Sequence, residues 1–147
     1  MIKVDYIHEI KCPFSTAQVV KIVKTAAQFE KKIIGEVEII VVSNQTIKKI
    51  NRRYHHRDAV TDVLSFAWQE DKIVSSSKLG QIYIAYPRIV AQAKEWKVSP
   101  EEEFIRMLVH GLLHLSGYDH AQPAAARRMF KKQERIVNQC LCFLGED

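Results

Sequence analysis

Cysteines and long apolar runs are scarce in this chain of 147 residues, and each scarcity narrows the possibilities. The three cysteines, Cys12, Cys140 and Cys142, are an odd number and form no C-x-x-C pair. We therefore expect reduced thiols with a structural role and no disulfide framework. No apolar run approaches ~20 residues, which argues against a membrane-spanning helix. The first residues, Met1–Asp5, lack the apolar core of a signal peptide. We expect a cytoplasmic protein.

The balance of residue types is ordinary for a globular protein. Hydrophobic residues make up 47% of the chain and charged residues 27%, and the length is typical of one domain with its own core. We therefore expect a single domain over residues 1–147. The formal net charge of +5 mildly favours a polyanionic partner such as nucleic acid.

Strand and helix patterns alternate along the chain. Apolar and β-branched runs predict four strands, at 2–6, 36–42, 62–68 and 81–86. Apolar residues at helical spacing predict five helices, at 16–30, from a cap at Asn44 to Tyr54, at 87–96, from a cap at Ser99 through the histidines, and at 123–144. The polar stretch 69–78 is expected to be a loop. This alternation predicts an α/β fold with one roughly four-stranded sheet covered by helices, in a strand order that the pattern leaves open.

Three histidines near the end of a predicted helix give the strongest functional signal. His110 and His114 are four residues apart, so both rings lie on one helix face, ~6 Å apart. Gly117 suits the left-handed residue that ends a helix, and His120 follows that turn. Three imidazoles with an open fourth position are the ligand set of a catalytic zinc site. We predict one Zn²⁺ per chain, held by these three histidines, in preference to three separate core histidines.

The spacing His110-x-x-x-His114-x-x-Gly117-x-x-His120 also matches that of metzincin proteases, so the metal helix resembles that of zincins. Those enzymes carry a glutamate directly after the first histidine as general base. Gly111 stands at that position here and has no side chain that could accept a proton. The ligands are therefore kept while the base is missing, which argues against a metalloprotease.

Two blocks of residues resemble the YbeY family of ribosomal RNA maturation factors. The first is His110-Gly111-x-x-His114-Leu115-x-Gly117-Tyr118-Asp119-His120. The second is Asn51-x-x-Tyr54, then Asp58, then Thr61-Asp62-Val63-Leu64-Ser65-Phe66, and a weaker match is Leu79-Gly80-x-Ile82. The resemblance covers nearly the whole chain. It implies a zinc-dependent, single-strand-specific endoribonuclease that matures the 3′ end of small-subunit ribosomal RNA and acts in ribosome quality control. Its partners would be ribosomal RNA and the small subunit, with no DNA and no membrane.

Four positions depart from the pattern usual in that family. His55 replaces an arginine, Val60 and Ala67 replace prolines, and Gln81 replaces an aspartate. We expect the changes at Val60 and Ala67 to affect turns only. The change at His55 bears on RNA contact, and the change at Gln81 bears on hydrogen bonding in the site.

A basic stretch from Lys48 to Arg57 is the expected RNA contact. Its side chains could hold the RNA backbone, and we predict phosphate contacts for Lys49, Arg53, His55 and Arg57. A solvated helix face is the alternative interpretation of the same charges.

The catalytic base is not evident from the sequence. The catalytic residues we expect are the ligand His114 together with Asp119 and Asp62. The candidates for the base are Asp119, which adjoins a ligand, and Asp62, which lies in the second block. For both carboxylates we favour a supporting role, in which they orient a ligand or cap a turn, over a role as base. A ribosome-assembly protein with a structural zinc is the alternative function.

Overall fold

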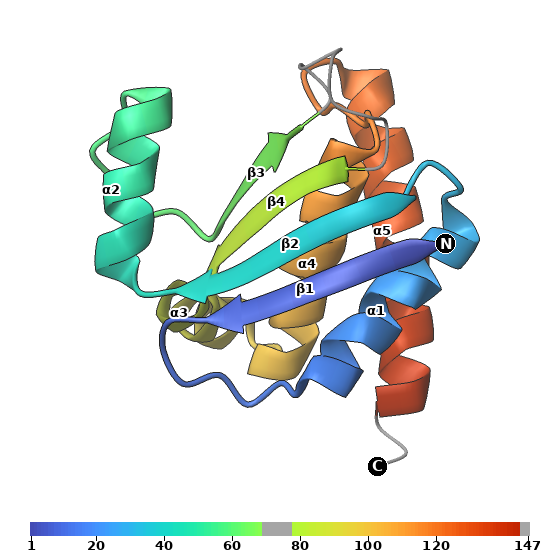
Figure 1. The fold of residues 1–147 in the computed structure, drawn as a ribbon, viewed down its shortest axis with the longest axis horizontal. Coiled ribbons are helices and arrows are strands. Elements are labelled where there is room, and N and C mark those ends of the chain that lie inside the picture. The colour runs from blue at the N-terminus through green and yellow to red at the C-terminus, as the bar shows by residue number, and fades with distance from the viewer. Residues whose placement is uncertain (69–77, 145–147) are drawn as a thin grey trace.

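The structure is a computed structural model, and it describes residues 1–68 and 78–144. Strands and helices follow one another in the predicted α/β order (Figure 1). The elements in chain order are β1 (Ile2–His8), α1 (Thr16–Phe29), β2 (Gly35–Val42), α2 (Asn44–His55), β3 (Val63–Ala67), β4 (Lys78–Ala85), α3 (Tyr86–Trp96), α4 (Pro100–Leu115) and α5 (Pro123–Leu144).

The four strands form one sheet in the order β1-β2-β4-β3. Strands β1, β2 and β4 run parallel, and β3 runs antiparallel to β4. Within the described residues β3 pairs with β4 alone, so its other edge is open. Figure 1 shows α1, α4 and α5 behind the sheet, while α2 lies beyond one end of it and leaves much of the front face uncovered.

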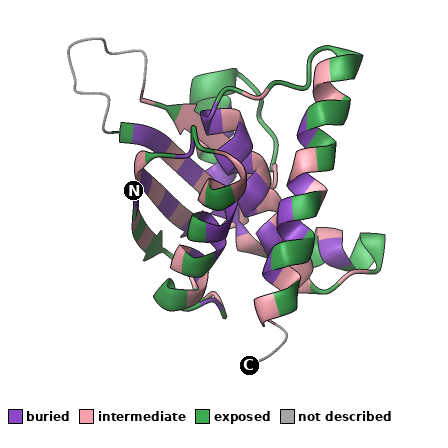
Figure 2. Ribbon diagram, turned by 90° about the vertical axis from the view of Figure 1, so that its right-hand side faces the viewer, coloured by how far each residue is buried: buried purple, intermediate pink, exposed green. Residues whose placement is uncertain are grey.

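Helix α4 lies at the centre of the core, between the sheet and α5. The four residues predicted to anchor it, Phe104, Leu108, Leu112 and Leu115, are all buried. Burial of each such side chain contributes roughly 1.5–3 kcal/mol to the stability of the fold. Figure 2 shows buried residues concentrated between the sheet and the helices. The histidines at the end of α4 are therefore carried by the most firmly packed element of the fold.

Helix α2 is attached to the rest of the fold by a small set of contacts. Ile47 packs with Val42 and Ala85 in a second, smaller cluster. Asn51 is buried, and its Nδ2 donates to the carbonyl of Ala59 at 3.0 Å, which fixes the connection from α2 to β3. The residues that follow Asn51, from 52 to 60, are all exposed.

Several predicted boundaries were wrong at helix and strand ends. Ser43, not Asn44, caps α2: its backbone is extended and its Oγ accepts from the amide of Thr46 at 3.1 Å. Strand β4 begins at Lys78, three residues before its predicted start. Its predicted last residue, Tyr86, opens α3 because the proline after it favours a helix start. The predicted loop at 69–78 lies outside the described residues except for Lys78, which begins β4. No helix among the described residues is both long and apolar enough to cross a membrane.

Candidate metal centre

The two ends of α4 are set by its sequence. At the first end, Ser99 is the predicted cap and its Oγ accepts from the amide of Glu102 at 3.1 Å. At the other end, the amides of Gly117 and Tyr118 donate back to the carbonyls of His114 and Leu113, at 3.1 and 3.0 Å. This pair of bonds is a Schellman motif. Gly117 has a φ of 108°, which favours glycine, so it turns the chain as predicted and returns it toward the histidines.

The three histidines converge at this turn. Nε2 of His110 and Nε2 of His114 are 3.1 Å apart, and one ring nitrogen from each of the three residues lies within 4.8 Å of the others. Two nitrogens that bind one tetrahedral zinc ion at about 2.0–2.1 Å lie roughly 3.3 Å apart. The donor set and its spacing therefore fit one metal ion with a position left open for water. His110 and His114 are half-buried and His120 is exposed.

The surroundings favour the unprotonated form of His114. Burial lowers the pKa of its imidazole, and the neighbouring His110 and His120 lower it further. A metal binds the neutral imidazole, so this shift weakens competition from protons.

Gln133 of α5 orients the first ligand. Its Oε1 lies 2.8 Å from Nδ1 of His110, and its Nε2 donates to Glu134. Because Gln133 thus presents an oxygen that can only accept, Nδ1 of His110 carries the proton and Nε2 keeps its lone pair for the metal. Gln133 is itself buried.

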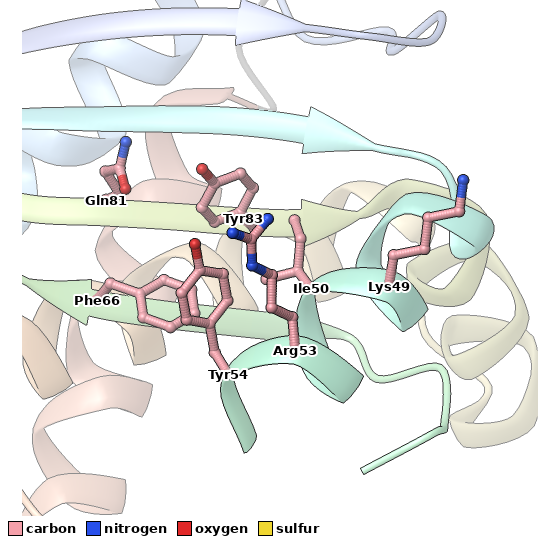
Figure 3. Close-up of a pocket in the computed structure, with 7 residues that line it drawn as sticks. All are labelled: Lys49, Ile50, Arg53, Tyr54, Phe66, Gln81 and Tyr83. Atoms are coloured by element: carbon pink, nitrogen blue, oxygen red, sulfur yellow. The ribbon is translucent and has the colours of Figure 1, made fainter. Parts of the chain in front are cut away.

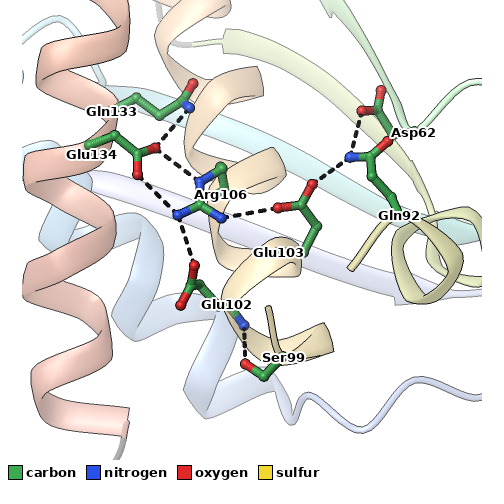
Figure 4. A network of polar contacts seen from close by, with 8 residues as sticks. All are labelled: Asp62, Gln92, Ser99, Glu102, Glu103, Arg106, Gln133 and Glu134. Carbon is green, nitrogen blue, oxygen red and sulfur yellow. Dashed lines mark hydrogen bonds and ion pairs between the residues drawn. The ribbon is translucent and has the colours of Figure 1, made fainter. Parts of the chain in front are cut away.

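Behind Gln133 lies a network centred on Arg106 (Figure 4). The guanidinium donates to Glu134, Glu102 and Glu103 at 3.0–3.1 Å. These hydrogen bonds, that to Glu134 foremost, raise the pKa of Arg106 and keep it charged despite burial. Arg106 therefore ties α4 to α5 beside the first metal ligand.

The same network reaches the opposite wall of the site. Nε2 of Gln92 lies within hydrogen-bonding distance of the carboxylates of both Asp62 and Glu103. Asp62 also accepts from the amide of Val63 at 2.7 Å. Its carboxylate is therefore held in place by α3 and by the start of β3.

A cavity of about 480 Å³ opens at the histidines. We call it the metal cavity; its lining residues include the three histidines, His55, Asp62 and several residues of β3. Asp119 does not line it, and its Oδ1 instead accepts from the amide of Ala121 at 3.1 Å. The two candidate carboxylates are thus separated: Asp62 faces the cavity, whereas Asp119 shapes the turn that carries His120.

The predicted RNA contacts are divided between three hollows. Lys49 and Arg53 line a groove on the open face of the sheet. His55 lines the metal cavity and also an adjacent one, which it shares with Arg57. All four side chains are exposed, and His55 lies where two of the hollows meet.

Ala67 and Gln81 depart from the family pattern, and the expectation for each was wrong. Ala67 is no turn residue: it ends β3, pairs with Gly80 and lines the metal cavity. Gln81 lies in the groove, where its Nε2 donates to Glu38 at 3.0 Å, and not among the residues that line the metal cavity. Among the cysteines, Cys140 is buried as a structural residue should be, but Cys142 is exposed.

Gly111 marks a close approach between α4 and the sheet. A Cβ at this position would lie 3.0 Å from Ser65 Oγ and 3.0 Å from Ile82 Cγ2. The position where a metzincin has its glutamate is therefore filled by the sheet, and a longer side chain does not fit there.

Fold and site together define an α/β protein with a zincin-like metal helix and a three-histidine centre. Residues 5–141 match the family described as Endoribonuclease YbeY. Two curated members of that name are similar over nearly their whole length: the one from Malacoplasma penetrans is 35% identical over 90% of each chain, and the one from Brevibacillus brevis is 35% identical over 95% of this chain and 97% of that one. A solution structure of a protein from Thermotoga maritima superposes with a TM-score of 0.68 at 27% identity, covering 99% of this chain and 93% of that one. The chain belongs to the YbeY family.

Proposed function

We propose that this protein is a zinc-dependent endoribonuclease that cuts single-stranded RNA. The observation that carries the proposal is the convergence of three histidines on a cavity that also contains a carboxylate and borders basic side chains. Membership of a family whose curated members are named endoribonucleases supports the same reaction.

The metal would be held by His110, His114 and His120. When bound, a zinc ion supplies a water of lowered pKa and an electrophile for a phosphoryl oxygen. Gln133 fixes the ring of His110, and burial lowers the pKa of His114, which favours its unprotonated form. The basic side chains beside the cavity hold the phosphates of the strand and offset their charge.

Asp62 is the better placed of the two carboxylates to act as general base in the metal cavity. It lines the metal cavity, and its hydrogen bonds from Val63 and Gln92 fix its direction. Asp119 serves the turn before His120. Asp62→Asn should therefore lower the cleavage rate without loss of metal, whereas Asp119→Ala, which removes the acceptor for the Ala121 amide, should act through the position of His120 and lower metal content.

The substrate we infer is ribosomal RNA. The resemblance described above implies maturation of the 3′ end of small-subunit ribosomal RNA and ribosome quality control in the cytoplasm, and the net charge of +5 suits an RNA partner. The groups that carry this charge near the site, Lys49, Arg53 and Arg57, are exposed and available to a strand.

The test is cleavage of a labelled single-stranded RNA by zinc-loaded protein, with a duplex of the same sequence alongside. We expect endonucleolytic products from the single strand, none from His114→Ala, and full activity from His8→Ala, which removes an exposed histidine of β1. Equal cleavage by His114→Ala would contradict the assignment. Tight RNA binding with no cleavage at all would favour the assembly protein over the nuclease.

A further inference from the structure

The groove on the open face of the sheet contains aromatic side chains to which the metal chemistry gives no role. It has a volume of about 370 Å³ and lies between α2 and strands β3 and β4 (Figure 3). The side chains that matter here are Lys49, Arg53 and Tyr54 of α2, Phe66 of β3, and Gln81 and Tyr83 of β4.

The aromatic side chains form a continuous surface that is open to solvent at one end. Tyr54 is the most open of them, with 59% of it exposed. Its ring centroid lies 5.3 Å from that of Phe66, which in turn lies 5.9 Å from Tyr83. The guanidinium of Arg53 lies 5.6 Å from the Tyr54 ring. Exposed rings beside cations are the combination by which proteins stack unpaired bases and hold their phosphates.

Charge in the groove also favours a nucleotide. The lining residues within the described chain include two cations, Lys49 and Arg53, and no carboxylate. The carboxylate of the nearby Glu38 is not among the lining residues, and it accepts a hydrogen bond from Gln81 at 3.0 Å.

The groove is joined to the metal cavity through β3. Side chains alternate along a strand: Phe66 lines the groove, whereas Ser65 and Ala67 line the metal cavity. The ring of His55 stacks on Phe66, with centroids 5.7 Å apart and planes at 23°, and also lines the metal cavity. An RNA strand that crosses the open edge of β3 can therefore contact the groove and the metal cavity over only one or two residues of β3.

We propose that the groove binds one unpaired base of the RNA strand whose cleaved phosphate lies in the metal cavity, with Tyr54 as its stacking surface. The inference rests on the proposed ribonuclease function and adds a specificity site to it. A base within a duplex is already stacked on both faces and paired along its edge, so it cannot enter the groove. Base stacking here thus contributes to a preference for single strands.

The test compares two ligands on zinc-loaded protein: a 2′-O-methyl oligoadenylate, and the same backbone with every base removed. Integrity of both is checked on a gel after titration. Tyr54→Leu should weaken binding of the oligoadenylate about five- to 150-fold, which corresponds to the ~1–3 kcal/mol of one base–aromatic stack. It should leave binding of the baseless backbone unchanged. Tyr54→Phe, which keeps the ring, should bind both ligands as the native protein does.

Trp96→Leu is the matched control, because it also removes an exposed aromatic side chain. Trp96 lies at the end of α3, and 69% of this residue is exposed. Thermal unfolding verifies that each variant is folded. If Tyr54→Leu binds the oligoadenylate as tightly as native protein while both still cleave RNA, the groove is not a base site and the nuclease assignment stands. An equal loss for both ligands would mean that Tyr54 acts on the backbone. If native protein neither binds nor cleaves RNA, the proposed function itself fails, and this inference with it.

Discussion

Gln133 on α5 and His110 on α4 share a hydrogen bond of 2.8 Å that decides which nitrogen of the imidazole faces the metal cavity. The two residues are 23 positions apart in the sequence. Their contact depends on the packing of α5 against α4, which Arg106 fixes through Glu134. Ligand geometry at the metal centre is therefore a property of the helix interface as well as of the histidine motif.

Replacing Gln133 should weaken metal binding while the three ligands stay in place. In Gln133→Leu, Nδ1 of His110 loses its acceptor and the ring loses its fixed orientation. Loss of such a supporting contact typically costs 10- to 100-fold in affinity, so we expect the zinc dissociation constant to rise by about that factor. Competition with a fluorescent chelator measures it. Gln139→Leu, on an exposed part of the same helix, is the control and should bind zinc as the native protein does.

Replacing Gly111 with alanine should change the folding stability in the direction opposite to that usual for a helix. Glycine to alanine within a helix is normally stabilising by roughly 0.5–1 kcal/mol. Here the new methyl would lie 3.0 Å from Ser65 and Ile82, so we expect Gly111→Ala to destabilise by about 1–3 kcal/mol instead. Urea unfolding measures the change. Gly111→Glu should destabilise the protein more than Gly111→Ala does, and it should gain no peptidase activity. Cleavage of casein by Gly111→Glu would show that a glutamate at this position can act as it does in metzincins.

The sequence predicted what depends on local pattern. Helical spacing placed Phe104 and Leu108 in the core, and ligand type with helical phase placed His110 and His114 on one face. A serine before proline predicted the start of α4, and Gly117 predicted its end.

Features that depend on contacts between distant segments were missed. Gln133 lies in a helix with no motif around it, and only the packing of α5 brings it to His110. Arg106 follows Glu102 and Glu103 at helical spacing, which signals local ion pairs but not the bond to Glu134. Tyr54 continues the apolar side of α2, yet it lies beside Phe66 in the groove and stays exposed.

Glu134 should make stability depend on pH in the acid range. Burial raises the pKa of its carboxyl, but hydrogen bonds from Arg106 and Gln133 outweigh burial and leave the pKa below its ordinary value. The unfolded chain then takes up this proton at a higher pH than the folded one. The stabilisation is therefore complete above about pH 4.3, the ordinary glutamate pKa, and is lost as pH falls through the lower, folded value.

Unfolding free energies of Glu134→Gln and native protein, measured by urea between pH 7 and pH 3, test this. We expect the variant to be less stable at pH 7 and the difference to shrink as the pH falls. Gln139→Leu, a change at an exposed and uncharged residue of the same helix as Glu134, is the control and should run parallel to the native protein. A constant difference between Glu134→Gln and native protein would mean that the carboxylate charge is not what stabilises this interface.

The exposed cations should contact phosphates rather than bases. Neutralising Lys49, Arg53 and Arg57 to alanine should weaken binding of every single-stranded RNA to a similar extent. Each lost contact should flatten the slope of log affinity against log salt by about 0.7–1. Titrations at several salt concentrations give the slope.

A charge-matched control is available on the opposite side of the fold, where Lys24, Lys31 and Lys32 are exposed on and after α1. The triple alanine variant of these lysines has the same net charge as the first one. If both triple variants lose affinity equally, the effect is one of overall charge, and the cluster around α2 is simply a solvated face.

His55 stands where the family usually has arginine, and its position makes the substitution testable. It is exposed, stacks on Phe66 and lines the metal cavity beside the three ligands. Arginine is charged at every relevant pH, whereas histidine near neutrality is only partly charged. If His55 contacts phosphate, a permanent charge at this position should hold the RNA more tightly. His55→Arg should then bind RNA more tightly than the native protein in titrations at pH 8, and His55→Ala should bind it more weakly than either.

The control is His56→Asn, which removes the adjacent imidazole and keeps a residue that tolerates the left-handed backbone at that position, where φ is 56°. Identical RNA affinities for native protein, His55→Arg and His55→Ala would transfer the role to Arg57, which lines the adjacent cavity and carries a permanent charge.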